Sequence, residues 1–417
     1  MSNFGESLRR RWIASLVGWI ACGICAIVAQ AQPAALTEFP VPSPDSAPRG
    51  IAAGPDGNLW FTELSTSQVA AITPAGVITE FPLRAGPAAG VFSMARSRWS
   101  LRASTFDSGP IGITTGPDGN LWCAAFDALY IGRVTPTGEV TEFGPTHGSP
   151  FFITLGADGN LWFTDYGANQ IGRMTPSGSF TEFATPTASS GPIGLSRGPD
   201  GNVWFVEFAS NQIGRVTPSG VITEFPIPTP ESGPRAITTG ADGNLWFTEE
   251  FGNQVGRMTP DGTISEFPIG TDESHPRSIA SGPDGSLWFT EFVGNQIGRI
   301  TLDGTIREYG GLTDASRPID IAAGPDGALW FTEGVGNRIG RLIPTCLGDC
   351  SGDHEVTVDE LLTMVSIALG NAPVAACTAG DADGDGTVTI DEILGAVADA
   401  LGTCGPTAAV LSMDPVR

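Results

Sequence analysis

The feature that most constrains this chain is a ten-residue phrase that occurs seven times. Its clearest copy runs from Gly240 to Glu249 and reads Gly-Ala-Asp-Gly-Asn-Leu-Trp-Phe-Thr-Glu. The copies begin at Gly54, Gly116, Gly156, Gly198, Gly240, Gly282 and Gly324, so successive copies are 62, 40, 42, 42, 42 and 42 residues apart. A sustained period near 42 residues is typical of proteins built from stacked structural repeats.

Each copy predicts several short strands separated by turns. The Asp-Gly pair supplies a turn that needs positive φ, and Leu-Trp-Phe follows with residues that suit a half-buried pleated surface. A second turn around Gly-Asn-Gln, a strand such as 297–301 and a last strand such as 223–226 complete the unit. The pattern therefore predicts four short strands in each repeat.

The two ends of the repeat region complete each other. Residues 36–40 have the sequence of a last strand, but no repeat precedes them, whereas the seventh repeat reaches Pro344 without a last strand. Pairing the N-terminal strand into the final repeat closes a ring and removes the open edges that invite aggregation. The sequence therefore predicts an all-β, seven-bladed β-propeller over residues 32–344.

Charge narrows the classes of partner. The chain has 21 Lys and Arg against 45 Asp and Glu, a net charge of -24. A nucleic-acid partner is excluded on this ground, because phosphate neutralisation needs a basic surface.

The N-terminal residues 1–31 predict a secretory signal. An arginine cluster at 9–11 precedes an apolar run over 12–29 and a small-x-small cleavage pattern at 29–31. An uncleaved anchor is the alternative, since about 18 apolar residues can just span a bilayer. No other segment predicts a membrane span, so we expect an extracellular or periplasmic protein.

The first repeat is longer than the others. Its spacing exceeds the period by 62 − 42 = 20 residues, and the excess lies at about 84–104. This insertion carries four arginines, Arg84, Arg96, Arg98 and Arg102. It is either a loop on one rim of the propeller or a loop that binds a partner.

Residues 345–405 follow a different pattern, with two acidic loops ahead of a tail at 406–417. The second loop places oxygen-bearing residues at positions 1, 3, 5, 7 and 12 of a calcium loop, with Gly386 at the sharp turn. The first loop has the same spacing but places His354 at that turn. The predicted calcium ligands are Asp349, Ser351, Asp353, Glu355 and Glu360 in the first loop, and Asp381, Asp383, Asp385, Thr387 and Glu392 in the second.

An amphipathic helix is expected after each loop, at about 358–369 and 390–401. A loop and helix repeated after about 32 residues resembles dockerin-type and related EF-hand modules. The four cysteines and the Glu at position 12 depart from the usual dockerin pattern, which leaves cohesin binding open.

Cysteines bracket the two acidic loops. Cys346, Cys350, Cys377 and Cys404 predict two disulfides with three possible connectivities. A zinc site is the alternative, although paired C-x-x-C elements are lacking. Cys123 stands at the Phe position of the second repeat and is expected to be a small buried side chain.

The repeat phrase, together with Asn-Gln-Ile-Gly-Arg and Thr-Glu-Phe-Pro, resembles the streptogramin B lyase family from Leu36 to Pro344. The resemblance implies a propeller that opens a cyclic depsipeptide by magnesium-assisted elimination, with a histidine as general base. The family's two functional histidines follow a proline just before the first strand of two adjacent blades.

Both matching positions are arginines here. Arg235 and Arg277 follow Pro234 and Pro276, and an arginine does not serve as a base near neutral pH. Of the two glutamates that bind the family's metal, one is matched by His275 and the other by Glu291, a possible magnesium ligand. His275 is a candidate for a shifted base, next to the matched position.

The residues that follow the prolines divide the predicted face in two. The residue after the proline is an arginine in blades 5, 6 and 1, as Arg235, Arg277 and Arg49, and an apolar residue in blades 2 to 4, as Ile111, Phe151 and Ile193. In blade 7 Ile319 follows the proline, and Arg317 just before the proline completes the arginine arc. Such an arginine arc suits an anionic or hydroxyl-rich ligand, because guanidinium groups offer paired donors to carboxylates and phosphates. The alternative is that these arginines pair with local carboxylates.

A second set of charges recurs inside the blades. An acid ends the phrase in every blade except at Ala125, and an arginine ends Ile-Gly-Arg in every blade except near Ala71. We expect these arginines to pair with the acid of the next blade.

Three functions follow from these patterns. The first is a secreted binding protein whose propeller takes a small molecule, a glycan or an extracellular protein, with a calcium-binding attachment module. The second is a carbon–oxygen lyase that opens a cyclic ester. The third is a scaffold unit of an extracellular complex.

Overall fold

The structure is a computed structural model that describes residues 36–83, 108–344, 348–350, 356–380 and 387–401. These residues form two compact units, a β unit and a small helical unit. The predicted signal at 1–31, the insertion at about 84–104 and the tail at 406–417 lie outside the described residues.

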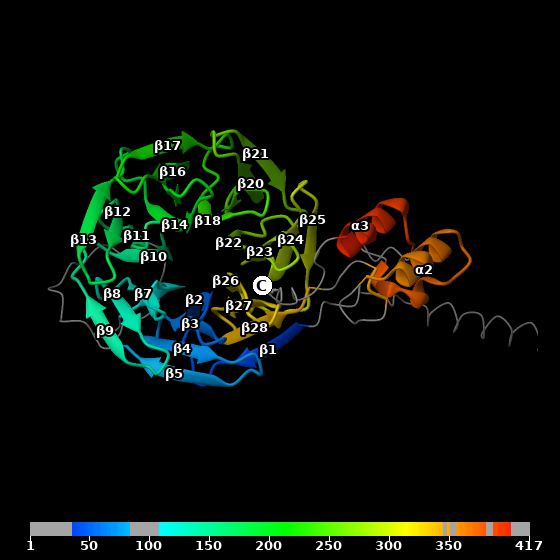
Figure 1. Ribbon diagram of the computed structural model, residues 1–417, viewed down its shortest axis with the longest axis horizontal. Coiled ribbons are helices and arrows are strands. Elements are labelled where there is room, and N and C mark those ends of the chain that lie inside the picture. Colours follow the sequence, from blue (N-terminus) through cyan, green and yellow to red (C-terminus); the bar gives the residue numbers. More distant parts are fainter. Residues whose placement is uncertain (1–35, 84–107, 345–347, 351–355, 381–386, 402–417) are drawn as a thin grey trace, which may run out of the picture. The chain divides into compact units, whose positions relative to one another are not determined.

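The β unit is a ring of seven four-stranded antiparallel sheets, which confirms the predicted propeller (Figure 1). The first strands of blades 1 to 7 are β2 (Pro48–Ala53), β6 (Pro110–Thr115), β10 (Pro150–Leu155), β14 (Pro192–Arg197), β18 (Pro234–Thr239), β22 (Pro276–Ser281) and β26 (Pro318–Ala323). The second strands are β3 (Leu59–Glu63), β7 (Leu121–Ala125), β11 (Leu161–Asp165), β15 (Val203–Glu207), β19 (Leu245–Glu249), β23 (Leu287–Glu291) and β27 (Leu329–Glu333).

The outer half of each blade has the same regularity. The third strands are β4 (Gln68–Ile72), β8 (Tyr130–Val134), β12 (Gln170–Met174), β16 (Gln212–Val216), β20 (Gln254–Met258), β24 (Gln296–Ile300) and β28 (Arg338–Leu342). The last strands are β5 (Ile78–Pro82), β9 (Val140–Phe143), β13 (Phe180–Ala184), β17 (Ile222–Pro226), β21 (Ile264–Pro268), β25 (Ile306–Tyr309) and, from the N-terminus, β1 (Leu36–Pro40).

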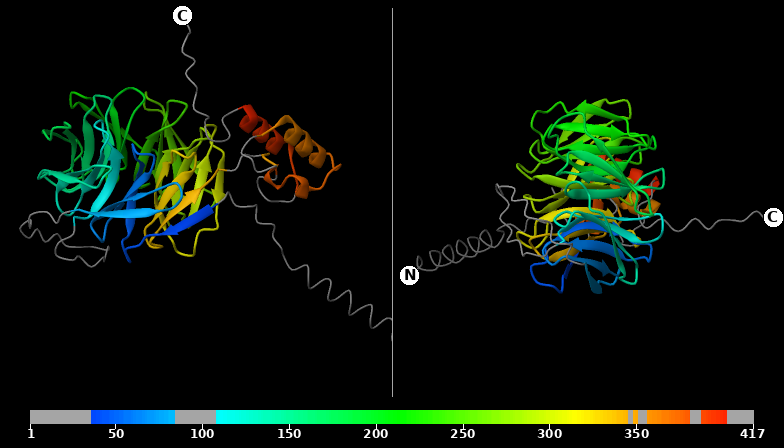
Figure 2. Two further views of the ribbon diagram at one scale, coloured as in Figure 1. Left: turned by 60° about the horizontal axis from the view of Figure 1, so that its bottom comes forward. Right: turned by 90° about the vertical axis from the view of Figure 1, so that its left-hand side faces the viewer.

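The ring closes as predicted. β1 pairs antiparallel with β28 from Leu36 opposite Leu342 to Pro40 opposite Arg338, so the seventh blade combines the two ends of the repeat region. Figure 2 shows the same ring from two further directions, with the loops that connect the strands on its two faces. Because the ring is closed, every blade has a neighbouring blade on both sides.

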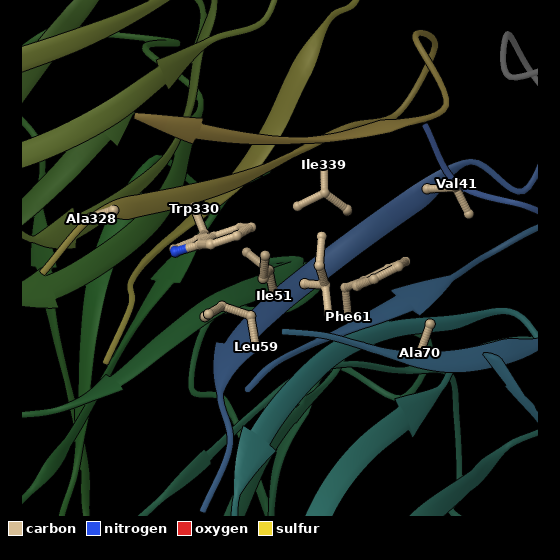
Figure 3. Packing of buried hydrophobic residues seen from close by; sticks show 9 residues of the cluster. Val41, Ile51, Leu59, Phe61, Ala70, Ala328, Trp330 and Ile339 are labelled. Carbon is tan, nitrogen blue, oxygen red and sulfur yellow. The ribbon is translucent and has the colours of Figure 1, made fainter. Parts of the chain in front are cut away.

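The core consists of seven clusters, one between each pair of neighbouring blades. In Figure 3, Trp330 of blade 7 packs against Ile51, Leu59 and Phe61 of blade 1. All seven tryptophans of the repeat phrase are fully buried in equivalent places. Each therefore joins its own blade to the next, and this burial is the main apolar contribution to ring stability.

Among the described residues, the salt bridges of the Ile-Gly-Arg arginines join them to an aspartate of their own blade and not to the acid of the next blade, so that prediction is wrong. Arg299 donates to Asp284 at 2.7 Å and Arg341 donates to Asp326 at 2.8 Å, both within one blade. Each of these arginines also stacks over the tryptophan that its strand faces. The reason is position: the arginine lies opposite the tryptophan, whereas the acid is three residues further along that strand, toward the other face of the ring.

The helical unit has α2 (Val358–Ala368) and α3 (Ile390–Leu401), with short 3₁₀ turns η1 (Val374–Ala376) and η2 (Thr378–Gly380) between them. Its core contains Met364, Ile367 and Ala396. A disulfide joins Cys350 to Cys377, which selects one of the predicted pairings. Cys346 and Cys404 lie outside the described residues. No helix in the described part of the chain is long and apolar enough to cross a membrane.

Candidate functional site

The start of each first strand and the end of each second strand lie on one face of the propeller. In blade 5, Pro234 is the register partner of Glu249, so the residue after the proline and the residue after the acid emerge side by side. We call this the proline face. It contains every arginine of the predicted arc.

Hydrogen bonds between blades fix the loops of this face. Asn253, in the Gly-Asn-Gln turn of blade 5, accepts hydrogen bonds from the backbone N–H and the hydroxyl of Ser274 in the loop that leads to blade 6. The same pairing joins Asn211 to Ser232. Because these serines are fully buried, the residues that follow them are held in a defined position.

A buried carboxylate, Glu250, organises the arginines of blades 5 and 6. Nη1 of Arg235 lies 3.0 Å from Oε2 of Glu250, and Nη2 of Arg277 lies 3.2 Å from Oε1. Glu250 is 5% exposed and Arg277 is 4% exposed. One carboxylate therefore holds the two arginine side chains of adjacent blades.

His275 belongs to the same cluster. Its Nδ1 lies 3.9 Å from Oε1 of Glu250, and its ring meets that of Phe251 edge to face, with centroids 5.9 Å apart. Its φ is 54°, a conformation that glycine adopts at the matching position of blade 5, Gly233. The side chain is thus directed to Glu250 and Phe251 by a backbone conformation that is uncommon for a residue with a Cβ.

Arg49, from blade 1, has no ion-pair partner among the described residues, and its buried Nε has no hydrogen-bond acceptor there. Burial and the charge of Arg235 lower the pKa of Arg49 to about 10. Burial, followed by the charges of Arg235 and Arg49, also lowers the pKa of Arg277 to about 9, although Glu250 acts in the opposite direction. The charge of Arg235 therefore disfavours the protonated form of both Arg49 and Arg277.

Arg317 of blade 7 is the fourth arginine of the arc, and its guanidinium group lies over an aromatic ring. The guanidinium carbons of Arg277 and Arg317 lie 3.3 and 5.2 Å from the ring centroid of Phe292. Stacking of guanidinium groups on a ring stabilises them without neutralising their charge.

Aromatic side chains form the rest of the proline face. Phe151 contacts the rings of Phe126 and Tyr166, with centroids 5.7 and 6.1 Å away. Phe208 lies under Arg235 and meets Phe251, which is 59% exposed. The predicted division into a charged and an apolar sector is therefore present, but the two sectors meet at Arg235.

Glu291 is fully buried, and neither of its carboxyl oxygens has a hydrogen-bond donor among the described residues. Burial and the charge of Glu308 raise its pKa to about 8. Glu249 and Glu333 are buried in the same way, so the orphaned oxygens are a property of the repeat and not of blade 6 alone. Since His275 faces Glu250, this pair does not reproduce a two-carboxylate magnesium site.

Four of the ten predicted calcium ligands lie in the described residues: Asp349, Glu360, Thr387 and Glu392. The carboxylate of Glu360 accepts hydrogen bonds from the backbone and hydroxyl of Thr357, and that of Glu392 does so from Thr389. Both glutamates therefore cap a helix, a role that such a residue also plays without a metal. Ser351, Asp353, Glu355, Asp381, Asp383 and Asp385 lie outside the described residues.

Glu250 is the residue that the sequence analysis missed. The residue after the acid of the repeat phrase is Leu64, Phe126, Tyr166, Phe208, Glu250, Phe292 or Gly334. The sequence did contain a signal for this residue, because Glu250 is the one charged residue among these seven equivalent positions.

Comparison with known proteins identifies the propeller. The model of the virginiamycin B lyase family matches residues 26–95 and 96–350. A solved streptogramin B lyase is 36% identical, with a TM-score of 0.66, and the alignment covers 74% of this chain and 96% of that one. A catalytically inactive virginiamycin B lyase from Staphylococcus aureus, solved with quinupristin, has the same identity and TM-score, and 99% of it is covered.

Two other matches share either a short stretch of sequence or the fold alone. Virginiamycin B lyase of Bordetella pertussis is 44% identical over 48 residues, which span 12% of this chain and only 16% of that protein. The extracellular domain of a hybrid two-component system protein from B. thetaiotaomicron aligns with a TM-score of 0.55 at 16% identity, over 74% of this chain and 42% of that one. The family model and the solved lyases together show that the chain belongs to the virginiamycin B lyase family.

Proposed function

We propose that this chain is a secreted binding protein that uses the proline face to hold an anionic or hydroxyl-rich ligand, and that it is not a lyase. The observation that carries the proposal is the pair of ion pairs that Arg235 and Arg277 form with buried Glu250. These arginines stand where the family resemblance implies the two functional histidines.

Proton abstraction at this place is disfavoured by charge. With a pKa of about 9, to which the favourable effect of Glu250 already contributes, Arg277 is neutral in about one molecule in a hundred at pH 7. Guanidinium groups are instead strong fixed donors for carboxylates, phosphates and hydroxyl groups. The ligand class is therefore a small molecule, a glycan or a protein surface that presents such acceptors.

A carbon–oxygen lyase is the second candidate, supported by the 36% identity to a streptogramin B lyase. Magnesium would be bound through Glu291, where it would polarise an ester carbonyl. His275 would then have to act as the base, although its side chain faces Glu250 and Phe251.

Ring opening tests the proposal. The purified chain is incubated with a type B streptogramin and magnesium, and the linear product is measured by chromatography beside an authentic lyase. We expect no product above the uncatalysed rate. Ring opening at an enzymatic rate, lost in His275→Ala, would overturn the binding proposal in favour of the lyase.

For the C-terminal unit we propose a dockerin-like calcium-binding module that attaches the propeller to a partner or matrix. Support comes from the ligand spacing of the two loops and from the equivalent positions of Glu360 and Glu392, each at the start of a helix. Calorimetric titration should show calcium binding at the second loop that Asp381→Ala abolishes, whereas Asp399→Ala, outside both loops, leaves it intact. Unchanged binding in Asp381→Ala would contradict the assignment. This test avoids the capping glutamates, whose loss would weaken the helices themselves.

A further inference from the structure

From the geometry of the proline face, we infer that it holds a specific site for an aromatic anion, with the anionic group on Arg49, Arg235 and Arg277 and the ring on Phe208 and Phe251. The inference rests on the proposed binding function and names the ligand class of that same face.

The charge of the cluster favours a bound anion. Arg49, Arg235 and Arg277 bring three positive charges, and the salt bridges of Arg235 and Arg277 are both made to the same carboxylate, that of Glu250. A surplus of positive charge in partly buried groups is costly unless a negative group compensates it. In a protein of net charge -24, this local surplus is opposite in sign to the rest of the molecule.

The unsatisfied side chain of Arg49 indicates where the anion would bind. Its Nε is buried without an acceptor among the described residues, although guanidinium N–H groups are normally satisfied when they are buried. Arg49 and Arg235 each directly follow the proline that begins the first strand of their blade, so both lie on the proline face. An anion placed between them would accept hydrogen bonds from both arginines.

An aromatic surface adjoins these guanidinium groups. The guanidinium of Arg235 lies 5.8 Å from the ring of Phe208, whose centroid is 5.6 Å from that of Phe251. Phe251 directly follows Glu250 and exposes 59% of its surface, so part of its apolar surface remains in contact with water. A flat apolar group bound there would cover this ring while its anionic substituent reached the arginines.

Calorimetry with matched probes tests the inference on the full chain. Phenyl phosphate, inorganic phosphate and phenol are titrated in a low-salt chloride buffer at pH 7.5. We expect phenyl phosphate to bind at one site at least about tenfold more tightly than inorganic phosphate, with phenol weaker than both, because only phenyl phosphate uses both surfaces.

Two variants separate the contributions. Arg49→Gln should weaken both phosphates by roughly tenfold or more, as expected for the loss of charge-assisted hydrogen bonds. Phe251→Ala should weaken phenyl phosphate and leave inorganic phosphate unchanged. Arg307→Gln, on the outer strand β25, is the matched control and should change neither affinity. If Arg49→Gln does not fold, Arg49→Lys, which keeps the charge but removes Nε, should still lower both affinities.

Equal binding of phenyl phosphate and inorganic phosphate, or equal binding by Arg49→Gln and the parent chain, would overturn the inference. These failures differ from failure of the proposed function. A chain that opens a streptogramin ring yet binds phenyl phosphate through Arg49 would refute the proposed function alone. A chain that neither opens the ring nor binds phenyl phosphate would refute the aromatic-anion site alone.

Discussion

The buried acids at the ends of the second strands predict that the propeller loses stability as pH rises. Burial, together with the charge of Glu266, raises the pKa of Glu249 to about 7, from an ordinary value of 4.5. The folded protein therefore holds this proton more tightly than the unfolded chain does. The stability that this contributes is fully present below pH 4.5 and is lost as pH rises to about 7.

The size of the effect follows from the shift. A change of 7 − 4.5 = 2.5 pKa units corresponds to about 3 kcal/mol for Glu249 alone. Burial also raises the pKa of Glu63 and Glu207 to about 7 and that of Glu333 to about 8, so the whole ring should respond in the same direction.

Glu249→Gln isolates one member of this set. The variant cannot ionise, so we expect it to match the parent protein near pH 4.5 and to exceed its unfolding free energy by up to about 3 kcal/mol at pH 8. Urea unfolding followed by tryptophan fluorescence reports on the propeller, because the seven repeat tryptophans lie in its core.

The matched control is Glu139→Gln, at an exposed carboxylate of blade 2. It should leave the pH dependence of the unfolding free energy unchanged. A parent protein whose stability is constant between pH 5 and 8, or a Glu249→Gln variant with the same pH slope as the parent, would refute the reasoning.

Three further predictions concern single contacts. Glu250→Gln should lower the unfolding free energy by about 3–5 kcal/mol, because buried Arg277 and partly buried Arg235 lose their counter-ion; a change under 1 kcal/mol would contradict the ion-pair assignment. Deletion of residues 36–40 should open the ring at blade 7 and produce association detectable by light scattering, whereas a monomer of unchanged melting temperature would show that closure by β1 is dispensable. Replacing both Cys350 and Cys377 with serine should destabilise the helical unit by about 2–4 kcal/mol in thermal unfolding, with the propeller transition unshifted as the internal control.

The repeat phrase was sufficient to predict the fold. Its tryptophan, its turns and its period are local features, and each blade forms them from its own residues. Even ring closure was predictable, because residues 36–40 carry the pattern of the strand that the seventh repeat lacks. The burial of Cys123 at a phenylalanine position follows from the same regularity.

The candidate site depended on tertiary structure. The sequence placed four arginines on one face, but their spacing along the chain did not show which carboxylate they would meet or which would remain unpaired. Glu250 pairs with Arg235 fifteen residues before it and with Arg277 twenty-seven residues after it, across two blades.

The difference has a physical reason. Backbone hydrogen bonding and burial of a repeated apolar pattern are decided within about 42 residues, so the chain itself specifies the blades. The balance of charge around the axis is set by side chains from blades that are far apart in sequence, and it exists only once the ring is closed. The sequence by itself determined a seven-bladed propeller with an arginine after the proline in blades 5 and 6, and the tertiary structure decided that these two arginines pair with Glu250.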